Sequence, residues 1–62
     1  MLTELEKYKL CFAISISEMD SGDKYDMFEA ILKDKEIDRR KFCEHTLEIF
    51  DAKLQALKNQ GE

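Results

Sequence analysis

The chain has 62 residues, no proline, two glycines and two cysteines, and 44% of its residues are hydrophobic. A chain this short forms one small domain with a marginal core, and two widely separated cysteines do not make a disulfide framework. Its 14 acidic and 10 basic residues give a net charge of −4, which argues against binding driven by nucleic-acid phosphates.

The same composition limits the environments in which the protein is expected. No apolar run approaches the roughly 20 residues that a membrane-spanning helix needs. Glu4 and Glu6 stand where a signal peptide would carry basic residues. Four Phe and two Tyr add apolar surface that a disordered chain would lack. We therefore expect a folded, soluble, cytoplasmic protein with free thiols and no membrane contact.

The first expected element is a helix over residues 3–20. Thr3 followed by Glu6 is the pattern of a capping box, in which each side chain accepts a hydrogen bond from the other residue's backbone N–H. In a helix, residues 8–17 are apolar around nearly the whole circumference. A three-helix monomer cannot cover every side of such a helix, so we expect a second copy to cover part of it.

The stretch "YKLCFAISIS", residues 8–17, also alternates apolar and small residues as a strand does. A lone strand leaves an unpaired edge, which a second copy would pair. In this pattern the chain resembles the ribbon-helix-helix family over residues 8–57, which implies a dimeric nucleic-acid-binding regulator. The acidic balance and the lack of Arg, Lys or Asn on the small-residue face of the strand argue against this alternative.

Two further helices are expected after a turn at residues 20–23. Asp23 is a suitable N-cap for a helix over 23–34, and Asp38 for one over 38–59, where Ile37 and Phe42 have the spacing of a hydrophobic staple. A single kinked helix over 24–59 is the alternative. The apolar seam of the last helix is expected to comprise Cys43, Leu47, Phe50, Leu54 and Leu57.

No residue pattern predicts catalysis, a cofactor or a metal site. Cys43 is expected to be buried in the seam. His45 and Glu48 are three positions apart and offer two metal ligands per chain, or four across a dimer axis, but a solvent-exposed histidine beside a carboxylate is the preferred interpretation. The loop that begins at Asp20 lacks the oxygen ligands of a calcium-binding EF-hand. We therefore expect a protein that is not an enzyme.

Arg39, Arg40 and Lys41 form the only basic cluster. They fall in the first turn of the helix expected over 38–59, where the helix dipole disfavours positive charge. A solvated charge run, an acidic protein partner, and phosphate or RNA are three open interpretations. In length and hairpin-like pattern the chain also resembles short dimeric helical hairpins that bind RNA.

These observations predict an all-α domain, a small helical hairpin or three-helix bundle completed by dimerisation. Its expected function is protein–protein interaction through apolar helix faces, as a regulator, adaptor, inhibitor or chaperone-like subunit. The predicted partner-binding residues are Arg39, Arg40, Lys41, Leu10, Phe12 and Ile14. The predicted dimer interface consists of Tyr8, Phe12, Ile16, Leu47, Phe50, Leu54 and Leu57.

Overall fold

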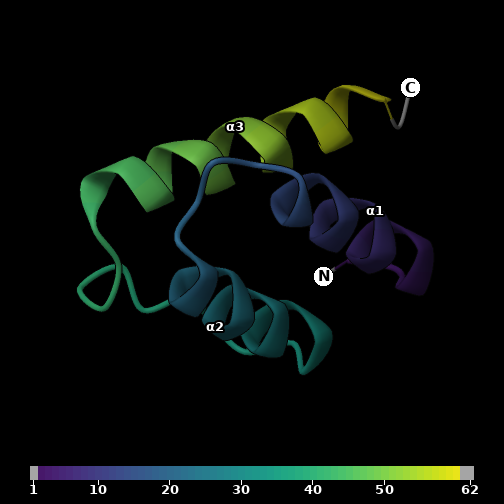
Figure 1. The fold of residues 1–62 in the computed structure, drawn as a ribbon. Helices are drawn as coiled ribbons and strands as arrows, with labels where there is room; N and C mark the ends of the chain where they lie inside the picture. Colours follow the sequence, from purple (N-terminus) through teal and green to yellow (C-terminus); the bar gives the residue numbers. More distant parts are fainter. Residues whose placement is uncertain (1, 61–62) are drawn as a thin grey trace.

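Three α-helices make up the regular structure in the computed structural model, which describes residues 2–60 (Figure 1). They are α1 (Glu4–Ser15), α2 (Ser21–Leu32) and α3 (Glu44–Gln60). No strand occurs in the part of the chain that the structure describes, which confirms the all-α prediction. Residues 8–17 lie in α1 and the turn after it, so the ribbon-helix-helix interpretation is wrong.

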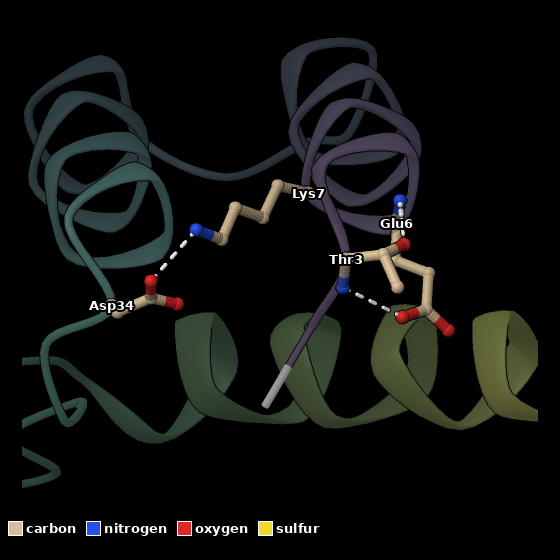
Figure 2. A network of polar contacts seen from close by, with 4 residues as sticks. All are labelled: Thr3, Glu6, Lys7 and Asp34. Atoms are coloured by element: carbon tan, nitrogen blue, oxygen red, sulfur yellow. Dashed lines mark hydrogen bonds and ion pairs between the residues drawn. The ribbon is translucent and has the colours of Figure 1, made fainter.

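The start of α1 follows the predicted capping box. The Thr3 hydroxyl accepts a hydrogen bond from the Glu6 backbone N–H at 3.2 Å, and the Glu6 carboxylate accepts one from the Thr3 N–H at 2.9 Å (Figure 2). The bond from the Thr3 backbone is the main reason why the pKa of Glu6 lies below its ordinary value. Two backbone groups that the helix leaves without partners are thereby satisfied.

The end of α1 comes at Ser15, well before the predicted end near residue 20. The Ser15 hydroxyl donates to the Phe12 carbonyl at 2.7 Å, and the Ser17 hydroxyl donates to the Ile14 carbonyl at 2.6 Å. Serine side chains offer the backbone local alternatives to helical hydrogen bonds. The Lys24 ammonium then donates to the Ser15 carbonyl at 2.9 Å, so the helix terminates where its last carbonyls already have other partners.

The N-cap of α2 is Asp20, and not Asp23 as predicted. The Asp20 carboxylate accepts a hydrogen bond from the Gly22 N–H at 3.1 Å. Gly22, which was expected to break the chain between helices, lies inside the first turn of α2 and has no positive φ. The chain leaves the helical conformation before Asp20, at Ser15 and Ser17, whose hydroxyls bond to carbonyls of α1.

Replacing Asp20 by alanine is expected to lower the free energy of unfolding by about 1 kcal/mol, because the first turn of α2 loses its side-chain acceptor. Urea denaturation followed by circular dichroism measures the change. Ser21→Ala is the matched control, because Ser21 is exposed and its substitution should stay within about 0.5 kcal/mol of the wild type. Equal losses from both variants would contradict the assignment of Asp20 as the cap.

A long connection over residues 33–43 joins α2 to α3 (Figure 1). The predicted helix start at Asp38 is wrong: its carboxylate accepts from the Arg40 N–H at 3.0 Å and its carbonyl from the Lys41 N–H at 3.0 Å, which makes an isolated turn. Three consecutive basic residues are a poor first helical turn, and α3 begins instead at Glu44. A continuous helix over 24–59 is likewise excluded.

Within the core, α1 packs against both α2 and α3. The buried apolar side chains are Leu10, Ile14, Met19, Met27, Ile31, Phe42, Phe50 and Leu57. Leu10 and Ile14 were predicted to bind a partner, and Phe50 and Leu57 to form a dimer interface. These four assignments are corrected, because the chain's own helices already cover those side chains.

An ion pair connects α1 to the end of α2. The Lys7 ammonium lies 2.8 Å from an Asp34 carboxylate oxygen, and the lysine side chain is nearly buried (Figure 2). The hydrogen bond to Asp34 raises the pKa of Lys7. Asp34 has φ of 56°, a left-handed conformation that aspartate tolerates better than most residues. It ends α2 and holds its carboxylate toward α1.

Candidate interaction surface

The outer face of α1 carries an exposed apolar stripe formed by Leu5, Tyr8, Phe12 and Ile16. Their spacing of three, four and four residues places them within one narrow sector of the helix surface. Leu10 and Ile14 lie on the opposite side, in the core. Phe12 is 67% exposed and Ile16 is 68% exposed. The helix is therefore apolar on two opposite faces, and only one of them is covered.

A shallow groove lies on the Lys9 side of this stripe, between α1 and α3. Its volume is about 430 Å³. Its lining consists of Lys9, Leu10, Phe12, Ala13, Ile16, Lys53, Ala56 and Leu57. The small side chains of Ala13 and Ala56 leave open space beside the large ones of the stripe, and Lys9 and Lys53 make its rim positive. Stripe and groove form one continuous surface across two helices.

The residues of the predicted dimer interface differ in their exposure. Tyr8 and Phe12 are exposed on α1, and Ile16 is exposed at its C-cap. Leu47 and Leu54 are partly buried against the core. Leu5, which the sequence reading did not single out, is 62% exposed and extends the stripe by one turn. Its spacing from Tyr8 and Phe12 is the signal that identifies it.

The basic cluster is largely engaged by acidic residues of the same chain. Arg39 donates to both carboxylate oxygens of Asp51, at 2.8 and 3.3 Å. Lys41 lies 3.9 Å from Asp26. Among the residues described, no ion pair involves Arg40 within 4.0 Å. The ion pairs of Arg39 with Asp51 and of Lys41 with Asp26 support the interpretation of the cluster as a solvated charge run. They connect the 33–43 segment to α3 and α2.

The Arg39–Asp51 pair predicts a measurable effect of acid. The hydrogen bond from Arg39 lowers the pKa of Asp51 below its ordinary 3.8. A depressed carboxyl pKa contributes stability that is complete above the unfolded-state pKa and is lost as pH falls through the folded-state pKa. NMR titration of the Asp51 carboxyl carbon is expected to give a midpoint below 3.8, and Arg39→Gln should raise that midpoint. An unchanged midpoint would contradict the pairing.

Cys43 is exposed and lies outside the core, which corrects the prediction that it is buried. Its Sγ donates a hydrogen bond to the Thr46 hydroxyl at 3.3 Å, and the Thr46 hydroxyl donates to the Asp23 carboxylate at 2.6 Å. When Cys43 is ionised, the Thr46 hydroxyl can donate to the thiolate, and this hydrogen bond to the charged form is the main cause of a lowered Cys43 pKa. In contrast, burial raises the pKa of the Cys11 thiol. The short chain of bonds ties the start of α3 to the first turn of α2.

The side chains compared with metal ligands in the sequence lie on α3 and at the start of α2. His45 and Glu48 are exposed on α3. Within residues 2–60, no group of three or more His, Cys, Asp or Glu side chains is placed to hold a metal ion. Of the acids in the segment compared with an EF-hand, Asp20 caps α2 and Asp23 accepts a hydrogen bond from Thr46.

None of the described helices combines the length and apolarity needed to cross a membrane. Comparisons with protein-family models, curated protein sequences and solved structures found no match. Function must therefore be inferred from the residues of this chain.

Proposed function

We propose that the protein is a non-enzymatic protein–protein interaction module whose binding surface is the apolar stripe of α1. The observation that carries the proposal is the second apolar face of α1. With each of the four side chains more than half exposed, the stripe presents roughly 500 Å² of apolar surface, the upper range of patches on monomeric proteins. Patches of this size commonly mark binding sites.

The rest of the fold supports a binding role for this surface. A capping box fixes the start of α1, the Lys7–Asp34 pair links it to α2, and its other face packs into the core. The stripe is therefore presented on a rigid element, which limits the conformational entropy lost on binding. Self-association and binding of a different protein are both ways to cover it, and the regulator or adaptor roles expected from the sequence use the same surface.

The basic cluster is the second candidate surface, and its charges are mostly neutralised within the chain. The RNA-binding alternative depends on these same three residues, and no structural observation favours it. Arg40 is the appropriate residue for a test, because its replacement breaks no ion pair seen among the described residues.

Capture from a native lysate, with the immobilised chain and mass spectrometry, tests the proposal. Phe12→Ser is expected to lose the captured protein, whether it is a second copy or another chain. Tyr25→Ser is the matched control, because Tyr25 is a 73% exposed aromatic residue on α2, outside the stripe. Arg40→Glu should retain capture. Loss of capture by Arg40→Glu and retention by Phe12→Ser would transfer the binding role to the basic cluster.

A further inference from the structure

We infer that the partner of the α1 stripe is a second copy of this chain, packed with the two α1 helices parallel. This inference rests on the proposed function and assigns the occupant of the same surface. The stripe has the spacing of a two-stranded helical seam: Leu5 and Phe12 are seven residues apart, and Tyr8 lies three residues after Leu5. Ser15 completes the seam with its hydroxyl bonded to the Phe12 carbonyl, and Ile16 flanks it.

The charges beside the stripe indicate a parallel orientation. Glu4, which precedes Leu5, lies on one edge of the seam. Lys9, which follows Tyr8 and is five residues after Glu4, lies on the other edge. In a parallel helix pair, the residues at these two positions face each other across the seam and form ion pairs that set partner and orientation. A two-fold axis would make two equal Glu4–Lys9 pairs. An antiparallel pair would instead bring the two Lys9 edges together.

Both charged residues are available for such pairing. Within the described residues, neither Glu4 nor Lys9 takes part in an ion pair within 4.0 Å. Lys53 of α3 lines the groove beside Lys9, so the second copy's Glu4 would approach two positive side chains. The groove also leaves space beside Ala13 and Ala56 for the edge of the second α1 helix. Because the two copies are identical, each would place its stripe edge beside the other's groove.

The exposed area matches a small specific interface. Two stripes of roughly 500 Å² each would bury about 1,000 Å² in total, the lower limit for a specific protein–protein contact. A contact of this size with aromatic residues at its centre is expected to dissociate in the micromolar range. Sedimentation equilibrium over a range from micromolar to several hundred micromolar should therefore show a reversible monomer–dimer transition.

Phe12→Ser is expected to raise the dissociation constant at least about thirtyfold, as for loss of a central aromatic contact. Tyr25→Ser should leave the constant unchanged. Because Phe12 is mostly exposed, the variant should keep the helical circular dichroism of the wild-type monomer. A wild-type chain that remains monomeric at several hundred micromolar would overturn the inference.

Charge exchange tests the orientation. Glu4→Lys and Lys9→Glu are each expected to weaken the dimer roughly three- to tenfold, because each places like charges together twice. An equimolar mixture of the two variants should form a heterodimer of wild-type strength, because both cross-helix pairs again join opposite charges, one with the wild-type sign and one with the sign reversed. Failure of the mixture to recover affinity would overturn the parallel arrangement.

Cross-linking provides an independent readout of orientation. In a Cys11→Ser, Cys43→Ser background, Leu5→Cys should form a disulfide-linked dimer under mild oxidation, because equivalent seam residues face each other in a parallel pair. In an antiparallel pair centred on the stripe, the two residues would lie about 16 Å apart, too far for a disulfide. A reversible dimer without this cross-link would overturn the parallel arrangement alone.

The combined results separate the two proposals. If the chain is monomeric but Phe12→Ser loses a captured protein of a different sequence, the second-copy inference fails and the proposed function stands. If the chain is monomeric and capture is the same for Phe12→Ser and the wild type, both fail. A reversible dimer that Phe12→Ser dissociates, with the cross-link through residue 5, supports both.

Discussion

Replacing Ile14 by alanine is expected to lower the free energy of unfolding by about 2–5 kcal/mol. Ile14 is 0% exposed and lies at the centre of the core, so the substitution removes buried carbon atoms and leaves a cavity. A domain of this length has roughly 3–9 kcal/mol of stability in total. The variant should therefore unfold roughly 8–40 °C below the wild type in thermal denaturation followed by circular dichroism.

Ile16→Ala is the matched control, because the same residue type lies two positions further along and is 68% exposed. Its expected cost is within about 0.5 kcal/mol when measured at a concentration too low for association. Phe12→Ala should behave in the same way. Similar destabilisation by Ile14→Ala and Ile16→Ala would mean that the two faces of α1 are wrongly assigned.

The contrast between these two isoleucines shows what the sequence could predict about α1. An apolar pattern around most of a helix predicts that one side lies in a core and that another side is left over. It does not say which side, because residues 8–17 alone present apolar residues in both directions. The structure resolves this through partners far along the chain: α3 and α2 both pack on the face that contains Leu10 and Ile14.

The helix boundaries show a similar limit. The capping box of Thr3 and Glu6 predicted the start of α1 because both bonding groups lie within one turn. Asp23 and Asp38 were predicted as N-caps by the same reasoning, but neither residue caps a helix. Asp23 accepts a hydrogen bond from Thr46 on α3, and Asp38 closes a local turn. A capping residue identifies where a helix can begin. Whether the helix continues depends on the next residues and on tertiary contacts.

The largest error of the sequence analysis was to predict helix from residue 38, where the structure has a non-helical segment up to residue 43. This error has a physical explanation. Ile37 and Phe42 were read as a staple at the start of a helix, and both do pack against the core. They do so from a non-helical segment that Arg39 and Lys41 connect to Asp51 and Asp26. The spacing of the two apolar residues does not reveal this arrangement, because the ion pairs that hold the segment involve residues distant in sequence.

Replacing Thr46 by valine is expected to lower the free energy of unfolding by about 1–3 kcal/mol, because the shape is kept and the hydrogen bond to Asp23 is lost. Thr46 is 1% exposed, and its hydroxyl lies 2.6 Å from the Asp23 carboxylate. In an Asp23→Ala background the same substitution should cost much less, which a double-mutant cycle by urea denaturation measures. Additive losses would contradict a direct bond between α2 and α3 at this position.

The pKa of the Cys43 thiol provides a second measurement, and a general loss of stability would not change it. Thr46 has one hydroxyl proton, which it donates to Asp23 while it accepts the bond from Cys43. A thiolate at Cys43 would compete with Asp23 for that proton. Thr46→Val should therefore raise the Cys43 pKa toward its ordinary 9.0, whereas Asp23→Ala should lower it further, because the carboxylate itself raises the thiol pKa.

The rate of alkylation of Cys43 as a function of pH, in a Cys11→Ser background, measures both shifts in the folded protein. Thr46→Ser is the matched control, because it keeps the hydroxyl and removes only a buried methyl group, so it should lose some stability and leave the thiol pKa unchanged. Shifts in the same direction for Thr46→Val and Asp23→Ala would show that the thiol responds to loosening of α3. Opposite shifts would show that the Thr46 hydroxyl lowers the Cys43 pKa while the Asp23 carboxylate raises it.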